Sequence, residues 1–150
     1  MRLALYQPDI AGNVGTILRL AACFGAAVDI IEPCGFPFSD RALRRAGMDY
    51  ADSAPVARHA DWNAFRAACS GRIVLLTTRA ELTTVNAVFD PGDTLLLGSE
   101  GAGVPDHVHG VADIRVRIPM RLGFRSLNVA VAAGIALAEA MRQTGTLPDD

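Results

Sequence analysis

The sequence predicts an α/β fold in which a mostly parallel sheet is flanked by helices. A strand, a helix and a second strand follow one another within residues 2–31. Two strands joined by a helix in so short a stretch normally lie parallel. A glycine-rich loop follows an apolar strand directly at residue 98, and the last helix is apolar on nearly every side. A helix of that kind must be buried on most of its surface.

The N-terminal strand is expected over Arg2–Tyr6, an apolar run that ends before Pro8. Residues 9–15 form a loop rich in turn-forming residues. Within it, Asn13 is expected to cap the next helix, because an Asn side chain can accept a hydrogen bond from an unpaired backbone N–H. That helix carries apolar residues at helical spacing, and Gly25 is expected to end it.

The β-branched run Ala27–Ile31 predicts the second strand. Ser39 is a suitable cap for a short helix that extends to about Ala46, and Asp61 is a suitable cap for another that extends to about Ala68. These elements complete a first strand–helix–strand unit and begin a second, which again favours a parallel sheet.

The C-terminal half of the chain predicts three more strands and a final helix. Strands are expected over residues 72–78, 94–97 and 114–120; the last alternates apolar residues with arginine, as a half-exposed strand does. Ser126 is expected to open the final helix, which extends to about Gln143. An apolar helix in a chain of 150 residues is expected to lie between the sheet and a second subunit.

The basic residues are clustered, although the net charge of −2 gives no general argument for nucleic acid. All 14 basic residues are arginine, which excludes a P-loop lysine and a Schiff-base lysine. Two clusters could hold a polyanion locally, or could be solvated faces paired with nearby aspartates, and composition favours neither. The clusters consist of Arg41, Arg44 and Arg45, and of Arg115, Arg117, Arg121 and Arg125.

Several features favour a cytoplasmic protein. The three cysteines are widely spaced and form no CxxC motif, which suits reduced thiols better than disulfides or a zinc site. The N-terminus lacks the apolar region of a signal peptide. The longest apolar stretch, residues 127–141, is interrupted by Asn128 and Glu139 and is shorter than the ~20 residues of a membrane span.

Three groups of residues could carry chemistry. The first is Asn13, Gly15 and Arg19 near a helix start, where exposed N–H groups favour anions; an ordinary cap with a surface arginine explains it equally well. The second is the glycine-rich loop with Glu100, at the edge where open α/β sheets bind ligands. The third joins a strand end at Ile118-Pro119-Met120 to a helix start at Ser126-Leu127-Asn128.

Together the three groups identify a protein family far more specifically than any one of them does alone. Their order, N-x-G-x-x-x-R, then G-S-E-G-x-G-V-P, then I-P-M and S-L-N, resembles the SPOUT class of RNA methyltransferases over essentially the whole chain. The stretches at residues 31–36 and 43–50 closely resemble the TrmL (YibK) family within that class. Members of that family are minimal tRNA 2′-O-methyltransferases, without an appended RNA-binding domain.

The resemblance implies a single SPOUT domain over residues 1–150, with a deep C-terminal trefoil knot over about residues 76–128. It implies homodimers that bury the last helix. The expected reaction is methyl transfer from S-adenosyl-L-methionine, leaving S-adenosyl-L-homocysteine, to the ribose of the wobble cytidine or uridine, position 34, in the tRNA anticodon loop. No metal is expected, since His107 and His109 have no third ligand nearby in the sequence.

The resemblance also implies roles for particular residues. Arg19 and Asn13 are the expected catalytic residues; an arginine, with a pKa above roughly 12, would orient the acceptor hydroxyl and stabilise negative charge rather than act as a base. The expected cofactor-binding residues are Leu76, Gly98, Glu100, Ile118, Met120, Ser126 and Asn128. The expected RNA-binding residues are Arg41, Arg44, Arg45, Arg121 and Arg125.

Other functions remain alternatives. A knotted methyltransferase could act on rRNA or on another tRNA position, although residues 32–50 favour the wobble-position family. A non-catalytic module that binds cofactor or RNA is a second alternative, which Ala102 and Ala138 leave open because the family often has polar residues there. A Rossmann oxidoreductase would need a dinucleotide fingerprint after the first strand, and the sequence has none.

Overall fold

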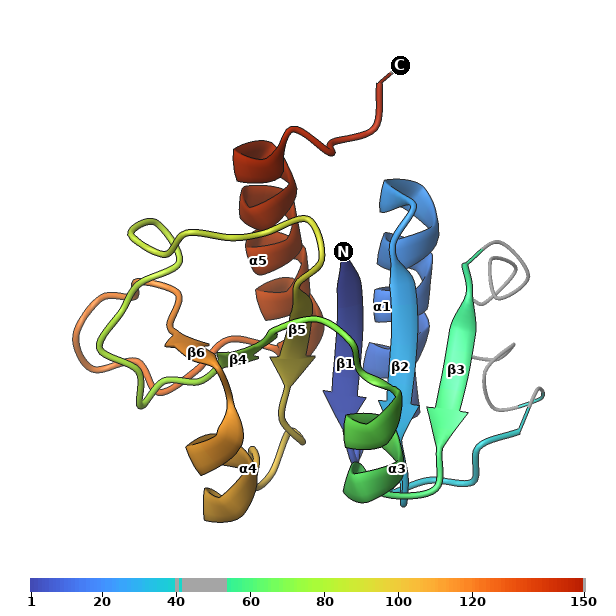
Figure 1. The fold of residues 1–150 in the computed structure, drawn as a ribbon. Coiled ribbons are helices and arrows are strands. Elements are labelled where there is room, and N and C mark those ends of the chain that lie inside the picture. Colours follow the sequence, from blue (N-terminus) through green and yellow to red (C-terminus); the bar gives the residue numbers. More distant parts are fainter. Residues whose placement is uncertain (40, 42–53, 150) are drawn as a thin grey trace.

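The structure is a computed structural model that describes residues 1–39, 41 and 54–149. Within those residues the strands form one six-stranded sheet in the order β3-β2-β1-β5-β4-β6, and every neighbouring pair is parallel (Figure 1). The strands are β1 (Arg2–Tyr6), β2 (Ala27–Ile31), β3 (Val56–His59), β4 (Ile73–Leu76), β5 (Thr94–Leu97) and β6 (Ile114–Val116). The helices are α1 (Ala11–Phe24), α3 (Trp62–Ala68), α4 (Asp106–Val111) and α5 (Val129–Thr144). The predicted parallel sheet with flanking helices is confirmed.

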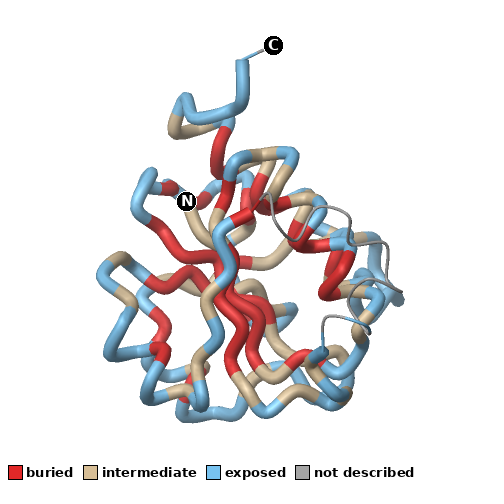
Figure 2. Tube along the Cα trace, turned by 90° about the vertical axis from the view of Figure 1, so that its right-hand side faces the viewer, coloured by how far each residue is buried: buried red, intermediate tan, exposed pale blue. Residues whose placement is uncertain are grey.

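The sheet is the middle of three layers. Helices α1 and α5 lie side by side over one face, and α3 and α4 cover the other (Figure 1). Successive strand residues point to opposite faces, and the buried strands form the centre of the molecule (Figure 2). The face toward α1 and α5 carries Leu3, Leu5, Val28, Ile30, Val74, Leu95 and Leu97. The face toward α3 and α4 carries Ala4, Tyr6, Ile31, Ile73, Leu75 and Leu96.

The first strand lies in the middle of the sheet. Arg2 is in register with Ala27 of β2 on one side and with Thr94 of β5 on the other. The N-terminal strand therefore joins the two halves of the chain, and the carboxyl ends of β1, β5 and β4 meet at one edge. That is the edge at which open α/β sheets place their ligands.

Most predicted boundaries are confirmed, and two helix starts are wrong. Gly25 ends α1 in the left-handed conformation with φ +68°, and the Asp61 side chain caps α3 by accepting from the N–H of Ala64. Asn13 does not cap α1, which begins after Ile10 without a side-chain cap. Ser126 does not open α5, which begins after Asn128. At α5 the cap is Asn128, two residues after Ser126, whereas the start of α1 is hydrogen-bonded by Glu100 from a distant loop.

Two other predictions differ from the structure. The strand expected over residues 114–120 ends at Val116; beyond it, Arg117 forms only an isolated bridge with Thr83, and Pro119 has no N–H to donate to a ladder. The elements β3 and α4 are short, and the sequence pattern did not predict them. The helix expected from Ser39 to about residue 46 lies almost wholly outside the described residues.

A buried carboxylate ties the starts of β4 and β5 together. Asp93 is fully buried and accepts hydrogen bonds from Nε and Nη2 of Arg72, both at 2.8 Å, and from the N–H of Asp90 at 2.8 Å. These bonds raise the pKa of the Arg72 guanidinium. The carboxylate is satisfied although it has left water, which is the condition for burying a charge.

Asp93→Ala is expected to lower the free energy of unfolding by about 2–3 kcal/mol, since hydrogen bonds to a charged group are lost and the N–H of Asp90 loses its acceptor. Chemical denaturation of both proteins measures the difference. Arg142→Ala is the control, because it removes an exposed i,i+3 ion pair with Glu139 and should leave stability nearly unchanged. Equal effects of the two substitutions would contradict this assignment.

Candidate functional site

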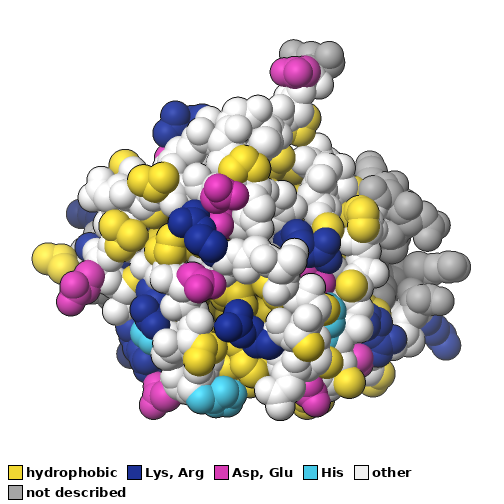
Figure 3. Space-filling view, viewed as in Figure 1, with side chains coloured by type: hydrophobic (Ala, Val, Ile, Leu, Met, Phe, Trp, Pro, Cys, Tyr) yellow, Lys and Arg dark blue, Asp and Glu magenta, His cyan; other side chains and the backbone are white. Residues whose placement is uncertain are grey.

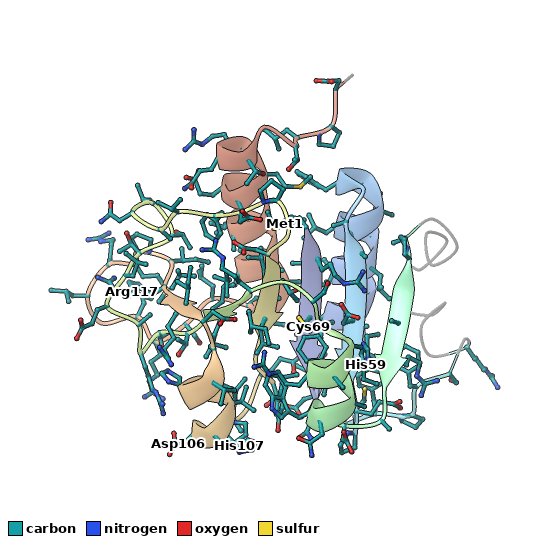
Figure 4. All side chains as sticks on the ribbon, in the orientation of Figure 1. Met1, His59, Cys69, Asp106, His107 and Arg117 are labelled. Atoms are coloured by element: carbon teal, nitrogen blue, oxygen red, sulfur yellow. The ribbon has the colours of Figure 1, made fainter. Side chains whose placement is uncertain are left out.

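A cavity of about 570 Å³ opens at the carboxyl edge of the sheet. Its walls come from the segments that follow β4, β5 and β6 and from the first residues of α1 and α5. Figure 4 labels one of the lining residues, Arg117, on the segment after β6. Loops that follow several neighbouring strands converge here because the strands are parallel and their carboxyl ends share an edge.

Seven residues expected to bind a cofactor line this single cavity, together with Asn13. They are Leu76, Gly98, Glu100, Ile118, Met120, Ser126 and Asn128. They come from four separate segments, so their convergence is a result of the fold and not of sequence proximity. Backbone groups of the loops and aliphatic side chains form much of the wall, a combination that suits a ligand with both apolar and polar parts.

The glycine-rich loop closes on itself at its neck. Ser99 and Gly103 exchange two backbone hydrogen bonds, of 3.0 and 2.9 Å, and Gly103 has a φ of +66°. A Cβ added to Gly98 would lie 2.6 Å from the Cα and carbonyl carbon of Gly103. Only glycine fits at position 98 without moving the loop, so the wall of the cavity depends on that residue.

Glu100 holds the loop against the start of α1. Its carboxylate accepts hydrogen bonds from the N–H of Asp9 at 2.7 Å, from the N–H of Ile10 at 3.3 Å and from Nδ2 of Asn13 at 3.1 Å. Asp9 in turn accepts from the N–H of Gly101 at 3.0 Å. The carboxylate thus takes up donors at a helix start that has no cap of its own. Glu100 is a positioning group in this arrangement as well as part of the wall.

Two asparagines connect the starts of α1 and α5. Nδ2 of Asn128 donates to Oδ1 of Asn13 at 2.9 Å, and Oδ1 of Asn128 accepts from the N–H groups of Ala130 and Val131. Asn128 is therefore the cap of α5, and Asn13 bridges Asn128 to Glu100. This network fixes the starts of α1 and α5 relative to the glycine-rich loop. The polar side of the cavity is therefore held in place by hydrogen bonds among these three segments.

His109 is a cavity residue that the sequence pattern did not identify. Its Nε2 atom is buried and has no hydrogen-bond partner among the described residues. Burial lowers the pKa of the imidazole, and the positive charges of Arg79 and Arg115 lower it further. The only sequence signal was its H-x-H spacing with His107, which suggests a metal and not a cavity wall.

The arginines are placed in several environments. Arg19 is exposed on α1 and does not line the cavity. Arg115 donates to the carbonyl oxygens of His109 and Gly110, so its guanidinium stabilises the end of α4. Arg41, Arg121 and Arg125 are exposed, whereas Arg44 and Arg45 lie outside the described residues. Figure 3 shows basic side chains spread over the face seen in Figure 1, with acidic side chains among them.

Within the described residues, no three His, Cys, Asp or Glu side chains gather as a metal site would require. None of the helices in the described part of the chain is both long and apolar enough to cross a bilayer.

Comparison with known proteins places the chain among RNA methylases. The model of the SpoU rRNA methylase family matches residues 1–138. A tRNA (cytidine(34)-2'-O)-methyltransferase of Beijerinckia indica is 56% identical over 148 residues, covering 97% of this chain and 92% of the relative. The protein of the same name from Escherichia coli is 38% identical, covering 97% and 94%.

Solved structures agree with the sequence matches. A structure described as giving insights into the 2-OH methylation of C/U34 on tRNA superposes with a TM-score of 0.90 at 40% identity, covering 95% of this chain and 94% of the other. The SpoU methyltransferase AviRb from Streptomyces viridochromogenes, in complex with AdoMet, superposes with a TM-score of 0.81 at 26% identity. It covers 95% of this chain and 57% of AviRb.

Proposed function

This chain belongs to the SpoU rRNA methylase family, and on that premise we propose that it methylates the ribose 2′-hydroxyl of the wobble nucleotide, cytidine or uridine 34, in tRNA. The observation that carries the proposal is the 56% identity, over nearly the full length of both chains, with a tRNA (cytidine(34)-2'-O)-methyltransferase. The expected RNA methyltransferase fold and family are confirmed. The proposed compartment is the cytoplasm.

The cavity fits S-adenosylmethionine. Its volume of about 570 Å³ accommodates a nucleoside with an amino-acid tail, and Gly98 lets the loop that forms its wall close against the backbone of Gly103. Leu76, Ile118 and Met120 would pack against the apolar parts, while Ser126 and the backbone of the loops would hold the polar ones. Glu100 and Asn128 would keep those loops in place. When bound, this cofactor supplies a methyl group on a positively charged sulfur, so no metal is required.

Arg19 is the proposed catalytic residue, and Asn13 shapes the pocket beside it. An arginine stays charged at every physiological pH, so it would orient the acceptor hydroxyl and stabilise the negative charge that develops on its oxygen. Arg19 is exposed on α1 and lies outside the cavity of its own chain. We therefore place it at the cavity of a partner subunit, which makes the homodimer part of the proposed active site.

One side of α5 supports a dimer. The helix is buried against the sheet and α1 through its alanines and Leu137, yet Val131 is 50% exposed and Ile135 is 41% exposed one turn further along the same side. Two apolar side chains at i and i+4 on a helix form a stripe. A second copy that covered this stripe would remove both from water and would bring α1 of one chain toward the other chain.

Ile135→Asp is expected to convert the dimer into a monomer and to lower methyl transfer at least 100-fold, because a buried charge at the interface would have no partner. Light scattering after size-exclusion chromatography gives the mass, and labelled methyl transfer gives the activity. Val88→Asp is the matched control, since Val88 is 76% exposed and lies in the loop after β4. A dimer that survives Ile135→Asp would move the interface elsewhere.

The proposal includes the C-terminal knot. The segment after β6 pairs with the loop after β4: the N–H of Arg117 donates to the carbonyl of Leu82, and the N–H of Thr84 donates to the carbonyl of Arg117, each at 2.9 Å. The chain then passes from this pairing to the cap of α5 beside α1. In the proposed knot, the segment after β6 passes through the loop after β4. The hydrogen bonds between residues 82–84 and Arg117 support this path, because they hold the two segments together.

Two alternatives predict different products. A methyltransferase for rRNA or another tRNA position would use the same cavity, and a binding module would use it without turnover. Methyl transfer from labelled S-adenosylmethionine to unmodified and cell-derived tRNA, with the modified nucleotide mapped, separates the three. A 2′-O-methyl group at position 34 is the expected result. Methylation elsewhere supports the first alternative, and cofactor binding without transfer to any RNA supports the second.

A further inference from the structure

The loop between β6 and α5 exposes two large apolar side chains. Leu122 is 100% exposed and Phe124 is 72% exposed, and residues 121–128 are exposed throughout. Figure 3 shows hydrophobic side chains standing out at the left edge of the molecule, where the loops after β4 and β6 lie. Large apolar side chains exposed close together on a polar loop often mark a surface that binds a ligand or another macromolecule.

The loop is the rim of the cavity. Met120 on one side of it and Ser126 on the other both line the cavity wall. Between them a turn places Gly123 at a φ of +93°, with the N–H of Phe124 donating to the carbonyl of Arg121 at 3.4 Å. If one part of a large substrate entered the cavity, the neighbouring part that stayed outside would contact this loop.

The charge of the loop indicates which class of molecule it binds. Residues 117–128 contain three arginines, Arg117, Arg121 and Arg125, and no acidic residue. Arg121 and Arg125 flank the two apolar side chains and are themselves exposed. An aromatic ring between arginines is the combination with which proteins hold single-stranded nucleic acid, since the ring stacks on a base and the guanidinium groups contact phosphates.

We propose that Phe124 stacks on the base of an unpaired nucleotide that flanks the methylated one, with Leu122 against the edge of that base. This inference rests on the proposed function, which brings a single-stranded anticodon loop to the cavity. It goes further by assigning a base-binding platform to two residues. A second protein copy is a poorer occupant for this loop, because a cluster of arginines without acidic partners repels an identical cluster.

The experiment uses the full-length protein and anticodon stem-loop RNA with 2-aminopurine at either nucleotide that flanks position 34. Stacking on a ring quenches 2-aminopurine fluorescence. Wild-type protein is expected to quench one of the two RNAs, and Phe124→Ala is expected to abolish that quenching and raise the Kd for RNA about 10-fold. Phe124→Tyr should restore both, since it keeps the ring. The Kd for S-adenosylmethionine should stay unchanged in every variant.

Val88→Ala is the matched control, because it removes an exposed apolar side chain from the loop after β4 and should alter neither signal. Wild-type quenching and RNA affinity in Phe124→Ala would overturn the inference. The inference would also be overturned if Phe124→Ala became a monomer while the dimers that remained bound RNA as tightly as wild-type dimers do. That result would assign the loop to contact with a second copy of the chain. Mapping the methyl group formed by the wild-type protein distinguishes a failure of the proposed function from a failure of the base-binding inference. If position 34 is methylated but Phe124→Ala behaves as the wild type does, only the base-binding platform is refuted. If no methyl group is transferred, both are refuted.

Discussion

Arg19→Ala is expected to lower the rate constant for methyl transfer about 1,000-fold, because a positioned group that helps to remove or stabilise charge on an acceptor contributes roughly 10²–10⁴. The Kd for S-adenosylmethionine should change less than about twofold, because the proposed role of Arg19 is on the acceptor hydroxyl and not on the cofactor. Single-turnover transfer to tRNA measures the rate constant, and equilibrium dialysis measures cofactor binding.

Arg66→Ala provides the control for Arg19, since Arg66 is an exposed arginine in the last turn of another helix, α3. It should leave both quantities unchanged. Arg19→Lys should recover only part of the rate, because an ammonium group lacks the planar pair of donors of a guanidinium. If Arg19→Ala instead abolished cofactor binding and dissociated the dimer, Arg19 would be a structural residue and the proposed mechanism would be wrong. Mixed dimers of Arg19→Ala with Gly98→Ala subunits would reveal whether the residue acts across the interface.

Gly98→Ala is expected to weaken S-adenosylmethionine binding at least 100-fold. The new Cβ would lie 2.6 Å from backbone atoms of Gly103, and backbone cannot yield as a flexible side chain can. The two hydrogen bonds between Ser99 and Gly103 would have to break or shift, and the loop that forms the cavity wall would move with them. Calorimetric titration of the cofactor measures the affinity, and thermal unfolding reveals any loss of stability.

Gly101→Ala is the matched control in the same loop. Among the described residues, a Cβ at position 101 would meet only the Oδ2 atom of Asp9, at 3.4 Å, and Gly101 does not adopt a positive φ. Its cofactor affinity should stay within about threefold of wild type, since an ordinary van der Waals contact requires little rearrangement. If the two alanine variants bound the cofactor equally well, the neck of the glycine-rich loop would not control the cavity.

Three strands were predictable to the residue because each is a short apolar run bounded by a turn-forming residue. Arg2–Tyr6 and Ala27–Ile31 have the bounds that the sequence predicted, and so does Thr94–Leu97. Val56–His59 was not predictable, because this edge strand is half-exposed and has too few apolar residues to stand out. Helix starts failed for a different reason: a side chain such as that of Asn13 has the chemistry of a cap, but Glu100 from a distant loop supplies the hydrogen bonds there.

The cavity was predictable only as a set of segments. The motifs identified seven residues that line it, and parallel strands explain why their loops meet. His109 was not found, because α4 is short and its histidine enters the wall through tertiary packing. Arg19 shows the opposite limit. Its position on α1 was readable from the sequence, but the pattern of one chain cannot place it at the cavity of a second subunit, where we propose that it acts.

The central place of β1 determines how this protein must be made. Arg2 pairs with Thr94, and β1 leaves the ribosome before β5, so the backbone N–H and C=O groups on one edge of β1 stay unpaired until residue 97 has emerged. Contacts so distant in sequence slow folding, because a long loop must close before any pairing compensates for its entropy. An incomplete chain therefore exposes the strand edge most prone to pair with a neighbouring chain. Nascent chains of this protein are consequently expected to depend on protection from aggregation until the second half of the sheet is synthesised.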